Sequence, residues 1–439
     1  EALKTLNAGA LGLNTAVGQQ AGKAVTTGIK NTVIGGLAGD ALTDADNNTA
    51  IGYAALGADT LGSRSVALGR SALANQNFTT ATDTYNVAVG YAAGTAITTG
   101  INNTLIGSLA GDALTDADKN TAIGYAALSA DTKGSLSTAV GRMALTTQNF
   151  TTATNTYNVA VGHNAGLLVT TGVQNILIGG LAGDALTDAD FNIAIGHTSL
   201  GLDTLGSRSV AIGHSTLDAQ NFTTATNSYN VAVGHAAGSA VTTGIQNTIV
   251  GGLAGDAFTT SNNNTALGYA ALTAAAGNQN TALGSQTLVN NTGGLNTAVG
   301  QQAGKAATTG IQNTLVGALA GDALTDADQN VAIGASSLTT DTLGTGSVAI
   351  GYAALNEQNF TTATTTYNIA IGYKAGESVS TGIKNTFIGG LAADANTIGF
   401  NNIAIGYDAL GTNTASGANV AIGYEALKTY NNTTEASHF

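Results

Sequence analysis

A five-residue pattern recurs from one end of this chain to the other. Asn48-Thr49-Ala50-Ile51-Gly52 is one example, and small variations of it return 24 times, from 14–18 to 419–423. The spacing between successive copies is nearly constant. A short fixed period over a whole chain is typical of stacked units that form their core with their neighbours. Most units are 17 residues long. This length is too short for a helical hairpin but long enough for one coil with two short strands. We therefore expect an all-β fold, a parallel β-solenoid (β-roll) of about 24 coils.

The residues within a unit suggest which side chains point inward. We number each coil from its Asn or Ser, so that Asn48 is position 1 and Gly52 is position 5. Position 4 is always Val, Ile or Leu, position 2 is mostly Thr, Val or Ile, and position 3 is mostly Ala. Because side chains alternate along a strand, positions 2 and 4 share one face. We expect positions 2 and 4 to point into the coil and position 3 to point outward.

That assignment has a consequence for assembly. An outward column of Ala, with a larger apolar residue at regular intervals, is unusual for a solvated surface. It favours chains that pack side by side as a homo-oligomer; the alternative is that long loops fold over the column. The Asn at position 1 is expected to stack on the Asn of the next coil in an amide ladder.

The glycine at position 5 never varies. It marks a place where a side chain does not fit, because φ is positive or because two backbones crowd each other. We expect a second short strand or an extended corner after it. The first of these structural turn glycines are Gly18, Gly35, Gly52, Gly69, Gly90, Gly107 and Gly124.

The coils are also grouped into a longer period. Residues 14–439 read as one continuous solenoid, preceded by a partial coil at 1–13. Because the chain begins in the middle of a unit, we expect it to be part of a longer protein. Super-repeats of four coils each span 31–102, 103–174, 175–246 and 313–384, and two shorter coils occupy 264–295. The third coil of each super-repeat is longer than the others and should form a bump.

Composition argues against several classes of function. The formal net charge is −13 and the 13 basic residues are scattered, so a nucleic-acid interface is not expected. No apolar run reaches the roughly 18 residues of a membrane span. Repetition of the same side chains offers no unique pocket for a catalytic group or a cofactor. We therefore expect neither an enzyme nor a cofactor.

Acidic and histidine side chains could bind metal ions. Asp40, Asp44 and Asp46 could supply oxygen ligands to Ca²⁺, although solvated acidic loops are the simpler interpretation. Four histidines stand at position 6, where other coils have Tyr: His163, His197, His214 and His235. They could form a metal-binding column, but replacement of Tyr in an outward column is the simpler interpretation. We expect no metal site.

The bumps carry the sequence Gln-Asn-Phe-Thr-Thr-Ala-Thr. It includes possible glycosylation sites at Asn77, Asn149, Asn221 and Asn359. The alternative is a Thr-rich β-bulge anchored by Phe78 and Tyr85. An array of threonines that binds ice or another surface is disfavoured by our inward placement of position 2.

The repeat Ser209-Val210-Ala211-Ile212-Gly213, with its small residue three positions later, resembles the head repeats of trimeric autotransporter adhesins. Related repeats occur in phage tail fibres and in large secreted bacterial proteins. The resemblance covers essentially the whole chain, although these coils are longer than the family unit. It implies a left-handed parallel β-roll, usually with three chains around an axis, that adheres to host surfaces or matrix.

Together these observations predict a structural protein. We expect an extracellular or cell-surface fibrous protein of bacterial or phage origin, which displays periodic loops for adhesion or matrix assembly. A host surface, matrix or glycan would be the ligand, and the chain would be a trimer or a head-to-tail polymer. The alternatives are a phage tail-fibre shaft and the subunit of a self-polymerising extracellular filament.

Overall fold

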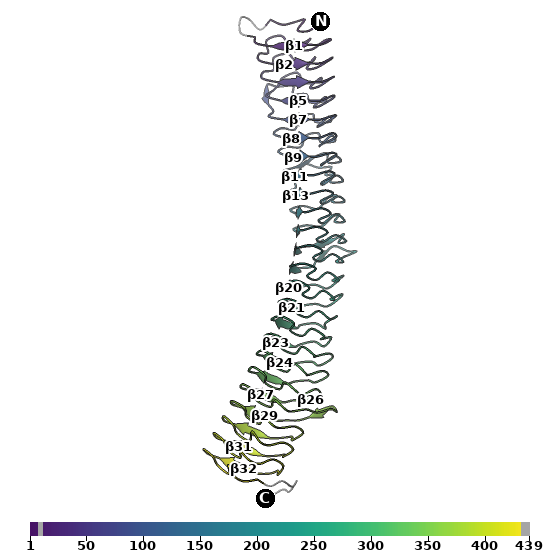
Figure 1. The fold of residues 1–439 in the computed structure, drawn as a ribbon. Coiled ribbons are helices and arrows are strands. Elements are labelled where there is room, and N and C mark those ends of the chain that lie inside the picture. Colours follow the sequence, from purple (N-terminus) through teal and green to yellow (C-terminus); the bar gives the residue numbers. More distant parts are fainter. Residues whose placement is uncertain (8–11, 432–439) are drawn as a thin grey trace. The chain divides into compact units, whose positions relative to one another are not determined.

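A computed structural model shows a parallel β-solenoid of about 24 coils (Figure 1). The structure describes residues 1–7 and 12–431, so the predicted partial coil 1–13 and the end of the last coil lie partly outside the described residues. By contacts the chain divides into two units, Glu1–Ser228 and Tyr229–Phe439, each of which is a solenoid. The handedness of the coils stays a prediction.

Each coil contributes one three-residue strand to a parallel sheet. In the first unit these strands are β1 (Thr15–Val17), β2 (Thr32–Ile34), β3 (Thr49–Ile51), β5 (Val66–Leu68), β7 (Val87–Val89), β8 (Thr104–Ile106), β9 (Thr121–Ile123), β11 (Thr138–Val140), β13 (Val159–Val161), β14 (Ile176–Ile178), β15 (Ile193–Ile195) and β17 (Val210–Ile212). In the second unit they are β19 (Val231–Val233), β20 (Thr248–Val250), β21 (Thr265–Leu267), β22 (Thr281–Leu283), β23 (Thr297–Val299), β24 (Thr314–Val316), β25 (Val331–Ile333), β27 (Val348–Ile350), β29 (Ile369–Ile371), β30 (Thr386–Ile388), β31 (Ile403–Ile405) and β32 (Val420–Ile422).

Within each unit, neighbouring strands pair without any shift in register. Thr32 pairs with Thr49, and Ile34 pairs with Ile51. The shorter coils keep the same alignment, since Thr265 pairs with Thr281. Equal coil positions therefore form continuous columns along each unit.

The predicted orientation of the strand side chains is wrong. Position 3 points into the coil, and positions 2 and 4 lie on the outer face of the sheet. Ala50 is fully buried, whereas Thr49 and Ile51 on either side of it are half-exposed, and nearly every strand repeats this pattern. The period-2 alternation is present but its two faces are exchanged.

The narrow interior explains why Ala stands at the buried position. In one type of coil, Ala50 at position 3 lies with Leu56 at position 9, and both are fully buried. In the other type the sizes are exchanged, as in the coil of Val33, Gly39 and Leu42. A Cβ built on Gly39 would lie 2.9 Å from Cγ1 of Val33 and 2.7 Å from Cδ1 of Leu42. In both of these coils a large side chain fills the space that a small residue leaves.

The predicted Asn ladder is present, although it runs mainly through the backbone. Oδ1 of Asn31 accepts a hydrogen bond from the backbone N–H of Asn48 at 2.9 Å. Nδ2 of Asn31 donates to the carbonyl of Ala45 at 2.7 Å. Asn31 and Asn48 are at most 1% exposed. Each side chain therefore fixes the return of the chain to the next coil.

The segment after the glycine is a tight turn, not the expected strand or extended corner. Positions 7 and 9 both adopt left-handed conformations, as at Gln20 (φ 62°) and Gly22 (φ 57°), or at Ala54 (φ 52°) and Leu56 (φ 53°). Extended backbone is impossible with two such residues. Among the described residues a second strand occurs at four places, where two-residue strands pair in parallel: β4 (Gly62–Ser63) with β6 (Thr82–Asp83), β10 (Gly134–Ser135) with β12 (Thr154–Asn155), β16 (Gly206–Ser207) with β18 (Thr226–Asn227) and β26 (Gly344–Thr345) with β28 (Thr364–Thr365).

Candidate functional site: the projecting loops

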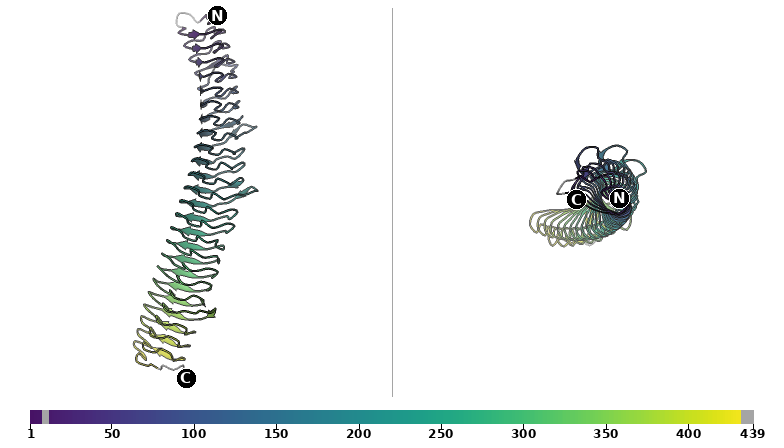
Figure 2. Two further views of the ribbon diagram at one scale, coloured as in Figure 1. Left: turned by 45° about the vertical axis from the view of Figure 1, so that its right-hand side comes forward. Right: turned by 90° about the horizontal axis from the view of Figure 1, so that it is seen from above.

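The long third coils of the super-repeats form the projections of the solenoid. Figure 2 shows such loops extending sideways beyond the neighbouring coils in the teal part of the chain. In the first of these loops Asn77, Thr79, Thr80 and Ala81 are exposed, whereas the side chain of Phe78 is buried. The equivalent loops lie at 149–153, 221–225 and 359–363.

A buried carboxylate holds the base of the first loop. Oδ1 of Asp59 accepts hydrogen bonds from the backbone N–H groups of Gly62 at 3.0 Å and Phe78 at 3.2 Å. Oδ2 of Asp59 accepts one from Nε2 of Gln76 in the next coil at 2.6 Å. Asp59 and Gln76 are both fully buried. Burial raises the pKa of Asp59 above its usual value, although these hydrogen bonds oppose that rise.

The network continues through Gln76 to the following strands. Nε2 of Gln76 also donates to Oγ of Ser65 at 2.8 Å, and Oε1 of Gln76 accepts from Nδ2 of Asn86 at 2.9 Å. The hydroxyls of Ser65 and Thr84 are 2.6 Å apart. A buried network in which every polar group has a partner makes the local structure rigid and favours a single conformation. The Asp–Gln pair recurs as Asp131–Gln148, Asp203–Gln220 and Asp341–Gln358.

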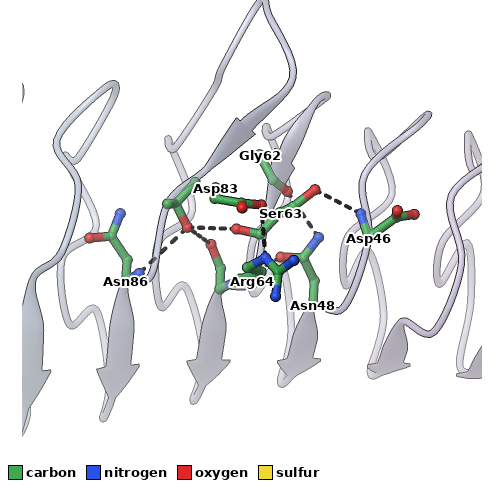
Figure 3. Close-up of polar contacts among 9 residues, drawn as sticks. Asp46, Asn48, Gly62, Ser63, Arg64, Asp83 and Asn86 are labelled. Carbon is green, nitrogen blue, oxygen red and sulfur yellow. Dashed lines mark hydrogen bonds and ion pairs between the residues drawn. The ribbon is translucent and has the colours of Figure 1, made fainter.

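Figure 3 shows the polar contacts beside this network at the loop base. Oγ of Ser63 accepts a hydrogen bond from the backbone N–H of Asp46 in the preceding coil at 2.9 Å. On the surface, Nε of Arg64 pairs with Oδ1 of Asp83 at 2.9 Å. The guanidinium of Arg64 also lies over the ring of Tyr85 at 5.8 Å. Exposed groups thus surround the foot of the loop, while the buried network fixes its backbone.

Sequence reasoning missed the Asp–Gln pair, although a signal was available. Asp and Gln stand one coil apart, on the second and third coils of each super-repeat that has a projecting loop. The short coils at 264–295 lack the loop and contain no aspartate. Of the two predicted anchors, Phe78 packs against the coils, but Tyr85 is 51% exposed.

The predicted glycosylation sites lie on the loops. Asn77, Asn149 and Asn221 are exposed, and Asn359 is half-exposed. Oδ1 of Asn77 accepts a hydrogen bond from Oγ1 of Thr60 at 3.1 Å. Modification of these asparagines stays a prediction.

The three aspartates considered for calcium have separate contacts. Oδ1 of Asp44 accepts from Oγ1 of Thr27 at 2.6 Å, and Oδ1 of Asp46 accepts from the backbone N–H of Ile29 at 2.8 Å. Asp40 is half-buried, and burial raises its pKa. Within residues 1–7 and 12–431, no group of three His, Cys, Asp or Glu side chains is placed to hold a metal ion.

The position-5 glycines have a positive φ and also lie against the backbone of the next coil, as the sequence predicted. Gly52 has φ +136°, and a Cβ on it would lie 2.5 Å from the carbonyl oxygen of Gly69. Gly18, Gly35, Gly90, Gly107 and Gly124 have φ between +130° and +142°, with similar contacts to the next coil. These residues serve the stacking of coils. The four histidines are exposed, and His197 and His214 stack with their centroids 5.5 Å apart.

Comparison with known proteins gives no relative to guide the assignment: neither a protein family nor a curated protein matches the chain. The described residues form no helix that is long and apolar enough to cross a membrane.

Proposed function

We propose that this chain is an extracellular structural or adhesive fibrous protein, whose solenoid holds projecting loops at regular intervals for adhesion or matrix assembly. The main support is the buried Asp–Gln network, which occurs where a loop projects and fixes the loop backbone. Exposed Asn and Thr side chains lie directly above it. The repeat's likeness to adhesin head repeats agrees with this role.

The proposal is tested by adhesion of beads coated with the chain to extracellular matrix and to glycan arrays. Changing the exposed Asn and Thr residues of all four loops (N77S, T79A, T80A and their equivalents) should abolish adhesion and leave the circular dichroism unchanged. The matched control changes an exposed turn threonine in the fourth coil of each super-repeat, Thr99→Ala and its equivalents. Equal adhesion by both variants would refute a role for the loops. Localisation to virions, and not to cell surfaces, would favour the alternative of a phage tail-fibre shaft.

The corrected orientation gives a different reason for self-association. Positions 2 and 4 carry no charged residue in any coil, and they form the outer face of the sheet. Large apolar side chains on this face are partly exposed, among them Leu68 (41%), Ile106 (38%) and Ile333 (37%). Burying such a face releases the water that covers it. We propose that three copies of the chain pack through these faces; a head-to-tail polymer is the alternative, and the mass in solution separates the two.

The same correction favours a second candidate function. The threonines at position 2 face outward, so the objection to an ice- or surface-binding array no longer applies. Thr32 and Thr49 are half-exposed neighbours in register, as are Thr104 and Thr121, on a face without charged residues. Inhibition of ice recrystallisation by the monomeric chain would support this function. A trimer that buries the face would exclude it.

The proposal includes no catalytic activity and no cofactor, because the same side chains repeat along the coils. It includes sugar attachment at Asn77, Asn149, Asn221 and Asn359, which the intact mass of the secreted protein tests directly.

A further inference from the structure

Position 6, directly after the glycine, carries an aromatic residue on about half of the coils, and between Tyr352 and Tyr424 these rings form a ladder. The rings of Tyr352 and Tyr373 stack with centroids 5.5 Å apart and planes 14° apart. Tyr407 and Tyr424 stack at 5.7 Å and 15°. Between 49% and 74% of each of these four residues is exposed. The ladder is thus accessible from solvent, with its rings nearly parallel.

The ladder is interrupted by one coil at Gly390. Strand β30 lies between β29 and β31 in register, so Gly390 stands between Tyr373 and Tyr407. At a strand spacing of about 4.8 Å, these two tyrosines are about 9.6 Å apart along the stack. A Cβ on Gly390 would lie 3.5 Å from Cδ2 of Tyr407, and the nearest atom of Tyr373 would be its carbonyl oxygen at 4.0 Å. The missing rung is therefore one ring wide.

We propose that this gap binds one flat aromatic ring, inserted between the rings of Tyr373 and Tyr407. An inserted ring would be stacked on both faces, in the offset geometry that the neighbouring pairs already show. Nζ of Lys374 lies 5.9 Å from the centroid of the Tyr373 ring and pairs with Oε1 of Glu377 at 3.0 Å, so this cation already has partners of its own. The ring can belong to a free aromatic compound or to an aromatic side chain of a partner polypeptide.

Equivalent gaps recur along the chain. Gly180 stands between His163 and His197, and a Cβ on it would lie 3.5 Å from Cδ2 of His197. Ser108 stands between Tyr91 and Tyr125. These gaps fall on the first coil of the super-repeats, so that a partner with several aromatic groups could engage several gaps with increased avidity.

The absence of Trp from the chain gives a direct test. Free indole and N-acetyl-tryptophanamide are titrated against the intact chain, with the probe's own fluorescence as the signal. Filling the gaps that have a ring on both sides (S108Y/G180Y/G252Y/G390Y) should weaken binding about ten-fold or more. The three glycines do not have left-handed φ, so tyrosine is allowed there. A matched variant with Ser at the three glycines should bind as the original chain does.

Unchanged or tighter binding to the filled variant would overturn the proposal, because a probe that lies along the outside of the ladder would gain from extra rings. A second measurement does not depend on the variant. In the unaltered chain with isotope-labelled tyrosine, an inserted indole should show nuclear Overhauser contacts to tyrosine rings; their absence would also overturn the proposal. If only free indole binds, the gap accepts small aromatic compounds. If N-acetyl-tryptophanamide binds equally well, the gap also accepts aromatic side chains of a polypeptide.

Discussion

The carboxylate of Asp59 accepts a hydrogen bond from Nε2 of Gln76 at 2.6 Å, across two adjacent coils and out of contact with water. The two residues belong to coils of different length. Their contact joins a regular coil to one that carries a projecting loop.

Removing the donor alone should be costly. In Gln76→Leu the buried carboxylate of Asp59 loses a hydrogen bond, and we expect a local loss of about 2–3 kcal/mol. Amide hydrogen exchange at 59–86 measures this loss at the affected coils, since coils of a repeat protein open locally. The double change Asp59→Leu and Gln76→Leu should not recover it, because the buried backbone N–H groups of Gly62 and Phe78 then lose their acceptor as well. Equal protection in Gln76→Leu and in the exposed control Thr79→Ala would contradict the assigned role.

The buried aspartates predict greater stability in mild acid than at neutral pH. Burial raises the pKa of Asp59, Asp131, Asp203 and Asp341 above the unfolded value of 3.8. The folded state therefore binds their protons more tightly. Their stabilising contribution is complete below pH 3.8 and is lost as the pH rises through the folded-state pKa.

This dependence is measured as the Tm of the original chain over a pH series. The variant D59N/D131N/D203N/D341N removes the four groups and should have a flatter profile. If both proteins gave parallel profiles, the four aspartates would not be the source.

Two adjacent glycines should respond oppositely to the same change. Gly35→Ala places a methyl group at φ +132° and 2.5 Å from the carbonyl oxygen of Gly52, and should cost about 3 kcal/mol or more. Gly36→Ala meets nothing closer than Cδ2 of Tyr53 at 3.5 Å and should be nearly neutral. Chemical unfolding of the two variants compares them; similar midpoints would argue against backbone crowding as the cause.

Charges on the outer face should disrupt the proposed trimer. The variant I106E/I176E/I333E changes half-exposed residues that contribute little to the interior of their own coils. We expect it to sediment as a folded monomer, because a buried carboxylate without a partner is strongly unfavourable. The control T80E/T152E/T224E adds the same charge on exposed loops and should keep the mass of the unaltered chain. If I106E/I176E/I333E still sedimented as a trimer, the outer face of the sheet would not be the interface.

The repeat period was enough to predict the parallel solenoid, because coils of equal length can align equal side chains only by stacking. The period could not decide which face is buried. With alternating side chains, either face of the strand could point into the coil. Thr49 and Ile51 were assigned to the interior, and Ala50 to the outside, because of their size and hydrophobicity. The structure makes the opposite choice, because Leu56 and Leu42 already fill the narrow interior from other coil positions. The Asp59–Gln76 pair could not be predicted from either residue alone, since the contact depends on the loop that it supports.

The side chain of Asn31 forms its bonds with residues that follow it in the chain, Ala45 and Asn48, and Asn48 and Asn120 likewise bond to residues of the coil that follows. A nascent polypeptide that emerges N-terminus first therefore meets, at each turn, a template whose amide is already in position. Assembly can advance in one direction as synthesis or export delivers the chain, without waiting for distant segments. The same asparagines that hold the finished molecule thus give its folding a direction.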